Sequence, residues 1–91
     1  MVFKKIGGCR RSVKEQRYIF AALEIWHLLP AESRMRAKDV MRQIAETDQE
    51  GQALRDVLMR GLSPERAREH TGVTRPRIYE MRREFYDRFW P

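Results

Sequence analysis

Apolar residues recur at intervals of three and four along most of the chain, the spacing that places them on one face of an α-helix. The first such stretch is expected to begin at Ser12, because Ser12 and Glu15 have the spacing of a capping box, in which each side chain bonds the other residue's backbone amide. It is expected to end at Pro30, which cannot continue a helix. Its inward face consists of Ile19, Phe20, Leu23, Trp26 and Leu29.

Two further helices are expected before residue 61. Residues 31–46 carry basic side chains on most of their surface and one apolar face, formed by Met35, Val40, Met41 and Ile44. Residues 47–51 have the composition of a turn or a weak helix cap. The next helix is expected to end near Gly61, a residue suited to a left-handed C-cap, and its inward residues are Ala53, Leu54, Val57 and Leu58.

Residues 61–83 predict two short helices joined by a tight turn. Ser63 is suited to cap the first helix and Pro64 to occupy its first position, where the missing N–H removes no hydrogen bond. That helix is expected to end near residue 70, and Gly72 can adopt the positive φ that a sharp reversal requires. Thr74 can cap the second helix, whose start and inward stripe contain Val73, Ile78, Met81 and Phe85. This order is typical of a helix-turn-helix, here at about residues 62–86.

The expected fold is therefore all-α, a small helical bundle of four to five helices that contains a helix-turn-helix. We expect a single helical domain over residues 12–91, preceded by a flexible basic arm over residues 1–11, where no helical periodicity is present. The arm either contacts a groove or the backbone of DNA or forms a solvated tail, and its basic residues are Lys4, Lys5, Arg10 and Arg11.

Residues 57–89 resemble DNA-binding helix-turn-helix units. They are most similar to the C-terminal unit of plasmid-encoded KorA/TrfB-type repressors, and they also resemble the sigma-region-4-like units of small phage transcription regulators. The residues that carry the resemblance are Val57, Leu58, Gly61, Gly72, Thr74, Arg75, Arg82 and Phe89. The chain departs from the pattern at Arg68, because these units usually have a small residue where the two helices cross. Either the first helix is rotated so that Ala67 faces the crossing, or the stem of Arg68 lies along it.

The resemblance implies which side chains would face DNA. Arg75 and Arg77 lie in the first turn of the second helix, which would insert deepest into the major groove, and a bidentate arginine–guanine contact discriminates between bases by about 1–3 kcal/mol. The implied base-reading residues are Arg75, Pro76, Arg77, Tyr79, Glu80 and Arg83. The implied phosphate contacts are Ser63, Arg66, Thr74 and Arg82.

The charge balance agrees with double-stranded DNA as the partner. The chain has 19 Lys and Arg residues against 13 Asp and Glu residues, a net charge of +6. The surplus lies in residues 1–17 and 61–91, and Arg is much more frequent than Lys. A basic surface attracts phosphate, and the guanidinium group matches phosphate and guanine edges better than an ammonium group does. An arginine-rich solvated surface without a partner is the alternative interpretation of the same composition.

Other classes of function lack the residues they need. No apolar run approaches the roughly 18 residues that span a bilayer, and the N-terminal residues lack the apolar core of a secretory signal. Cys9 is the single cysteine, so no internal disulfide can form, which fits a cytoplasmic protein. Cys9, His27 and His70 do not have the spacing of a metal site. Because no catalytic set or cofactor motif is present either, we expect neither an enzyme nor a bound cofactor.

The C-terminal aromatic residues are the strongest indication of oligomeric state. They lie on two faces of the last helix and comprise Phe85, Tyr86, Phe89 and Trp90. Either they contact a second copy of the chain, giving a homodimer suited to a palindromic site, or they fold over Trp26 and complete the core of a monomer. The size of the cluster in so short a chain favours the homodimer.

Together these patterns predict a sequence-specific double-stranded DNA-binding transcriptional regulator. Its assignment to a plasmid, phage or other mobile element rests on the resemblance alone. A repressor needs only to occupy its site, whereas an activator needs a second surface, for which residues 13–46 are available. The alternative is a protein-interaction module that docks on RNA polymerase or another component of transcription.

Overall fold

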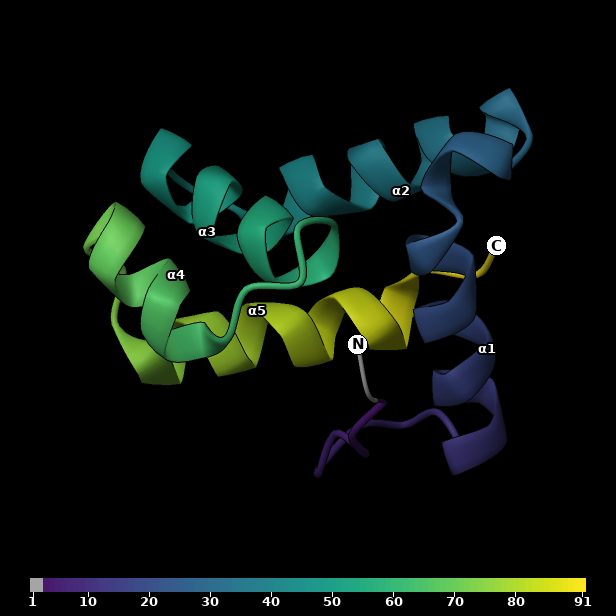
Figure 1. Cartoon of the computed structure of the whole chain (residues 1–91), viewed down its shortest axis with the longest axis horizontal. Helices are drawn as coiled ribbons and strands as arrows, with labels where there is room; N and C mark the ends of the chain where they lie inside the picture. Colours follow the sequence, from purple (N-terminus) through teal and green to yellow (C-terminus); the bar gives the residue numbers. More distant parts are fainter. Residues whose placement is uncertain (1–2) are drawn as a thin grey trace.

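Helices dominate residues 3–91, the part of the chain that the computed structural model describes (Figure 1). Five α-helices follow one another, with a 3₁₀ turn η1 over Trp26–Leu28, and no strand is present within these residues. The helices are α1 Val13–Glu24, α2 Ala31–Ile44, α3 Asp48–Leu58, α4 Pro64–Thr71 and α5 Arg75–Arg88. The prediction of an all-α fold with no strands is confirmed.

The helix starts follow local signals in the sequence. Ser12 and Glu15 form both bonds of the predicted capping box, and the hydroxyl of Ser63 accepts the backbone N–H of Arg66 at the start of α4. Thr47 is a true cap of α3, because its hydroxyl accepts the N–H of Glu50. The first helix differs from the expectation, since α1 ends at Glu24 and the chain tightens into η1 before Pro30. This tighter turn returns the chain to the core at Leu29, which is 8% exposed.

Helix α5 is the centre of the fold. It extends along the molecule and contacts α2, α3 and α4, and its C-terminal end approaches α1 (Figure 1). Ile78, Met81 and Phe85 of α5 are fully buried. They face the apolar stripes of the surrounding helices, which include Ile19 of α1 and Leu54 of α3. The inward stripe predicted for this helix is therefore its core face, and it fixes how the opposite face is presented to solvent.

Residues 3–12 differ from the flexible arm that composition suggests, because defined contacts hold them against α1 and α5. The side chain of Gln16, which is 1% exposed, accepts the N–H of Ile6 at 2.8 Å and donates to the carbonyl oxygens of Ile6 and Arg11. The carboxylate of Asp87 accepts the N–H of Arg10 at 2.7 Å. A buried glutamine that satisfies backbone groups pins irregular chain in place. The sequence gives no periodic signal for such contacts.

Three of the four C-terminal aromatic residues complete the core of one chain. Phe85, Tyr86 and Phe89 are between 0% and 4% exposed, and burial raises the pKa of Tyr86 to about 12. Trp90 remains 44% exposed beside Tyr18, with 5.3 Å between the ring centroids. This burial agrees with the alternative in which the cluster completes the core of one chain, and the homodimer stays a prediction.

Candidate nucleic-acid interface

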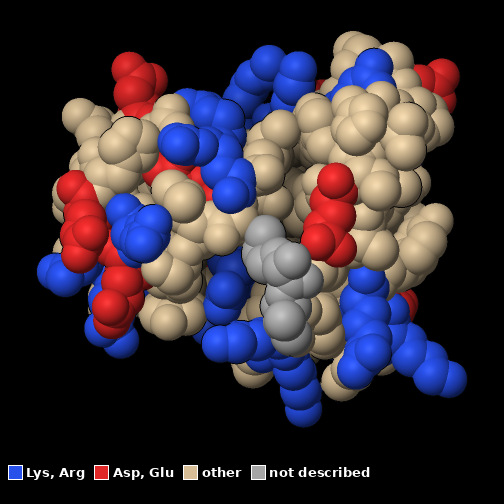
Figure 2. Space-filling model, in the orientation of Figure 1, with Lys and Arg blue, Asp and Glu red and all other residues tan. Residues whose placement is uncertain are grey.

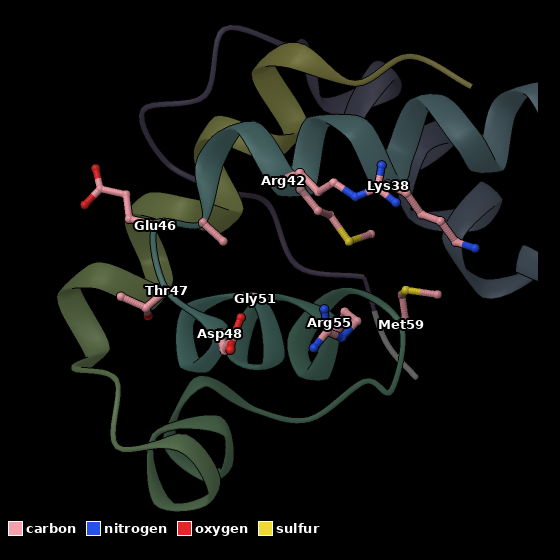
Figure 3. A pocket seen from close by; sticks show the side chains of 10 residues that line it. Lys38, Arg42, Glu46, Thr47, Asp48, Gly51, Arg55 and Met59 are labelled. Carbon is pink, nitrogen blue, oxygen red and sulfur yellow. The ribbon is translucent and has the colours of Figure 1, made fainter.

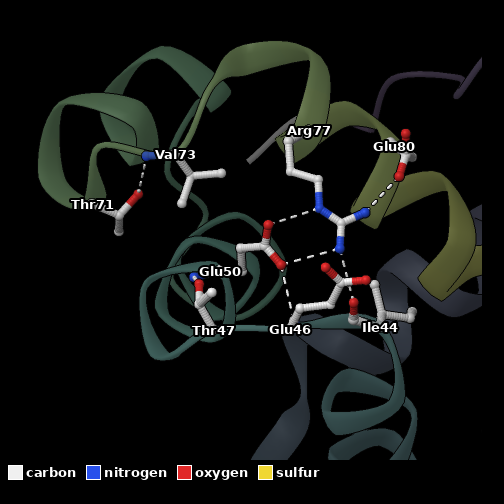
Figure 4. A network of polar contacts seen from close by, with 8 residues as sticks. All are labelled: Ile44, Glu46, Thr47, Glu50, Thr71, Val73, Arg77 and Glu80. Carbon is white, nitrogen blue, oxygen red and sulfur yellow. Dashed lines mark hydrogen bonds and ion pairs between the residues drawn. The ribbon is translucent and has the colours of Figure 1, made fainter.

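The connection between α4 and α5 is a sharp turn at Gly72. This residue has φ of 78°, in the left-handed region, and its N–H donates to the carbonyl of Arg68 at 2.8 Å. Val73 follows the turn and is 9% exposed. The hydroxyl of Thr71 accepts the N–H of Val73 (Figure 4). It also donates to the carbonyl of Ala67 at 2.7 Å. The left-handed backbone of Gly72, the hydroxyl of Thr71 and the buried side chain of Val73 together fix the reversal. The position of Gly72 is the one that the sequence predicts.

The rotation of α4 decides between the two arrangements expected for Ala67 and Arg68. Ala67 is fully buried, whereas Arg68 is exposed. The small residue is therefore present at the helix packing surface, one position earlier than expected. This frees the guanidinium of Arg68 to face solvent beside the start of α5.

A buried carboxylate joins α3 to α4. Asp56 is fully buried and accepts hydrogen bonds from Gln52 at 2.8 Å and Arg60 at 3.1 Å. Nδ1 of His70 on α4 lies 2.7 Å from the other carboxylate oxygen of Asp56. The N–H of Leu62 donates to the main-chain carbonyl of Asp56. Burial raises the pKa of Asp56, but the hydrogen bonds from His70 and Gln52 and the charges of His70 and Arg60 outweigh it, so the pKa lies below its ordinary value. The sequence offers no local signal for this contact.

The exposed surface between α4 and the start of α5 is the candidate interface. It is a shallow depression of about 500 Å³ lined by Arg68, Thr74, Arg75, Pro76 and Tyr79, and we call it the α4–α5 face. Arg75 is 49% exposed and pairs with Glu65 of α4 at 2.7 Å. Thr74 caps α5 without using its hydroxyl in a capping hydrogen bond, so that hydroxyl remains available to a ligand. Tyr79 is 41% exposed.

The residues at the start of α4 do not line this face. Arg66 is exposed, and its N–H is already bonded to the hydroxyl of Ser63. Ser63 therefore serves as a helix cap, and its role toward a ligand is limited to the neighbouring backbone amides. Pro64 occupies the first position of α4, as its sequence position indicates.

Arg77 does not extend into solvent, and its expected role in base reading needs correction. Its side chain is 22% exposed, and Nε and a terminal nitrogen bond the carboxylate of Glu50 on α3 at 2.9 and 3.1 Å. It also donates to the carbonyl of Ile44 at 3.0 Å and pairs with Glu80 (Figure 4). These contacts raise the pKa of Arg77, and the hydrogen bonds from Arg77 and from the N–H of Glu46 lower the pKa of Glu50. Arg77 joins α5 to the α2–α3 turn, and Glu80 is part of the same cluster.

Arg82 and Arg83 are half-buried and lie further along α5 than the α4–α5 face. The guanidinium of Arg82 lies over the Tyr79 ring, 5.2 Å from its centroid, and its Nε is buried without a hydrogen-bond partner. The stem of Arg83 lies close to Gly8 of the N-terminal segment. With Ile78 and Met81 buried, Arg82 and Arg83 lie at the border of the buried face of α5 and are less exposed than Arg75.

The basic residues of the N-terminal segment are not all exposed. Lys4, Lys5 and Arg10 are exposed. Arg11 instead donates to the carbonyls of Tyr86 and Phe89 at 3.1 and 3.3 Å, where it caps the C-terminal end of α5. Arg11 thus stabilises the end of α5 that is opposite to Arg75.

Charge is spread unevenly over the surface. On the side shown in Figure 2, Lys and Arg side chains alternate with acidic ones over α3 and α4 and form separate groups at the edges of the molecule. Acidic partners such as Glu65 reduce the field at the α4–α5 face without covering it. Residues 3–91 contain no cluster of three metal-binding side chains and no helix with the length and apolar character to cross a membrane.

No protein-family model matches the chain, and neither curated proteins nor solved structures give a match. The geometry of the α4–α5 face and the chemistry of its side chains are therefore the basis for a functional proposal.

Proposed function

We propose that the chain binds double-stranded DNA through the α4–α5 face, with α4, the Gly72 turn and α5 acting as a helix-turn-helix. The observation that carries the proposal is the division of α5 into two faces. Ile78 and Met81 are fully buried on one side, while Arg75 and Tyr79 are exposed on the other, at the N-terminal end of the helix. A helix held in this way by its own core can enter a major groove with its first turns foremost.

Each group on the face has chemistry suited to DNA. Arg75 can form the bidentate contact with a guanine edge, because its ion pair with Glu65 is exposed and such pairs are worth only about 0–1 kcal/mol. The free hydroxyl of Thr74 and the first amides of α5 can bind a phosphate. Arg68 lines the face, and the exposed Arg66 of α4 supplies further positive charge. We assign base reading to Arg75, Pro76 and Tyr79. We assign phosphate binding to Thr74, the first amides of α5, Arg66 and Arg68.

The regulatory role follows from the same proposal. Occupancy of a promoter by the bound chain would suffice to block polymerase without any further activity. The resemblance to plasmid and phage regulators favours a transcriptional regulator of a mobile element in the cytoplasm. Neither a cofactor nor a catalytic group is required for this mechanism.

Selection of bound sequences from random duplex DNA tests the proposal. The wild-type chain is expected to enrich one short motif. Arg75→Ala is expected to change the base preference at one position, whereas Arg66→Ala is expected to weaken binding to all sequences alike. Lys14→Ala removes the same charge from α1, at the other end of the molecule, and is expected to change neither (Figure 1). Recovery of unselected DNA at near-physiological salt would refute sequence-specific binding.

A protein-interaction module is the second candidate, and exposed apolar side chains favour it. Ile25, Leu28 and Met35 are 47%, 69% and 64% exposed, on and beside η1 and in the first half of α2. Exposed apolar groups of this kind mark interaction surfaces when they gather in one region. This surface lies far from α4 along the molecule, so binding of a protein there is compatible with DNA on the α4–α5 face (Figure 1).

A further inference from the structure

A second cavity lies between α2 and α3, away from the α4–α5 face (Figure 3). Its volume is about 490 Å³, within the range of small-molecule sites. The wall from α2 and the following turn consists of Lys38, Met41, Arg42, Ala45, Glu46 and Thr47. The opposite wall, from α3 and its C-terminal end, consists of Asp48, Gly51, Arg55 and Met59.

The lining combines an apolar surface with available positive charge. Met41 is 6% exposed and Met59 is half-buried, so their flexible thioethers offer an adaptable apolar surface. Gly51 leaves the middle of the α3 wall without a side chain, and a Cβ there would lie 3.4 Å from the guanidinium of Arg55. A glycine within a helix is unfavourable compared with alanine, so here it provides space rather than helix stability.

The cations of the cavity have few internal partners. Within residues 3–91, the Arg55 side chain bonds only the neutral amide oxygen of Gln52, at 3.1 Å. Lys38 makes no ion pair with any residue of the described chain. Arg42 pairs with Asp39, but both side chains are largely exposed and that pair is weak. The acidic residues lie at the other end of the cavity, where the side chain of Glu46 points away from it (Figure 3).

We propose that this cavity binds a small amphiphilic anion, a molecule with one carboxylate or phosphate group on an apolar body. The anionic group would contact Arg55 and Lys38, and the apolar body would lie on Met41 and Met59. Cations facing a groove of this size without a carboxylate partner are complementary to such a group. Glu46 and Asp48 line the other end of the cavity and disfavour a second anionic group there, so the ligand has a single anionic group.

The cavity shares its wall with the cluster that holds Arg77. The N–H of Glu46 donates to Glu50 at 2.9 Å, and Glu50 and the carbonyl of Ile44 in turn accept from Arg77 (Figure 4). A ligand that orders residues 45–47 therefore acts on the atoms that fix the N-terminal half of α5. We infer that a ligand in the cavity alters the environment of the Arg77 side chain. This effect does not depend on whether α5 binds DNA.

Nuclear magnetic resonance of the intact chain tests both statements without DNA. The probes are hexanoate, hexyl phosphate, the neutral hexanamide and inorganic phosphate. The account predicts saturable shifts of the Gly51 amide and of the Nε–H of Arg77 with hexanoate, hexyl phosphate or both, and weaker effects with hexanamide and inorganic phosphate. A preference between the first two probes identifies the anionic group. Equal effects of hexanoate and hexanamide would overturn the role of the charge, and no saturable shift with any probe would overturn the site.

Matched variants locate the contact. Arg55→Gln and Lys38→Gln each remove one charge from an exposed side chain and leave the core intact, and each is expected to weaken binding of the preferred probe about tenfold. Lys14→Gln removes the same charge from α1 and is expected to bind as the wild type does. Equal affinity in all three variants would contradict the proposed site. Shifts at Gly51 without any change at Arg77 would contradict the transmission to α5.

Discussion

Replacement of Asp56 by alanine tests how α4 is held in place for its proposed role. The variant removes a fully buried carboxylate that accepts hydrogen bonds from Gln52, Arg60 and His70. Hydrogen bonds to a charged group contribute about 1.5–3 kcal/mol each, and removing one partner of a buried pair costs about 3–5 kcal/mol when the other charge stays buried.

The side chains of Arg60 and His70 are 57% and 52% exposed, so both can be hydrated once Asp56 is lost. The expected loss is therefore smaller than the sum, at about 2–3 kcal/mol of the free energy of unfolding. For a domain of this size, such a loss lowers the melting temperature by roughly 10–20 °C.

Thermal and urea unfolding followed by far-ultraviolet circular dichroism at neutral pH measures this loss. Asp39→Ala is the matched control, because Asp39 pairs with Arg42 on the surface, where both side chains are largely exposed. Its expected effect is within about 0.5 kcal/mol. Asp56→Asn keeps the shape of the side chain and removes its charge. An Asp56→Ala variant as stable as Asp39→Ala would refute the reasoning that the buried carboxylate joins α3 to α4.

Three further outcomes are expected. Gly72→Ala meets no atom within 4 Å but forces alanine to a φ of 78°, so we expect a loss of about 1–2 kcal/mol in urea unfolding, and a melting temperature equal to that of the wild type would contradict the left-handed turn. The pKa values of Asp56 and Glu50 are lowered in the folded chain, so both carboxylates stabilise it above the unfolded pKa of about 4, and this stabilisation is lost as the pH falls through the lower folded value. The urea midpoint should therefore fall in the acid range, and it should fall less in Glu50→Gln. Arg77→Ala should destabilise the fold by about 1–3 kcal/mol, whereas Arg75→Ala should change stability by less than about 0.5 kcal/mol, and the reverse order in chemical unfolding would contradict their different environments.

The parts of the fold that sequence predicts are those encoded by residues close together in the chain. Three helix ends are predicted from signals no more than four residues long, and each lies where it is predicted. These signals are Ser12 with Glu15, Ser63 with Pro64, and Gly72. The spacing of apolar residues likewise identifies the core stripe of α5. The early end of α1 is the exception, because η1 follows it directly and no capping side chain marks the change.

The residues that sequence misplaces or misses act across long separations. Arg77 occupies the position of a base-reading residue. Its guanidinium instead donates a hydrogen bond to Glu50, which is 27 residues away in the sequence. The contact between Asp56 and His70 spans 14 residues, and Gln16 holds backbone groups of a segment with no helical pattern. No periodicity reports these pairs, because each depends on how two elements meet. The exposed side of α5 is therefore narrower than the helical pattern alone suggests.

The dependence of DNA affinity on salt concentration tests the central claim most directly. Each phosphate neutralised contributes about −0.9 to the slope of log K against log salt, so three to five contacts from the α4–α5 face and its flanks predict a slope of about −3 to −5. Arg66→Ala should reduce that slope by about one, whereas Arg75→Ala at a base-reading position and Lys14→Ala on α1 should leave it nearly unchanged. A slope near zero, or an equal loss for all three variants, would contradict DNA binding through this face.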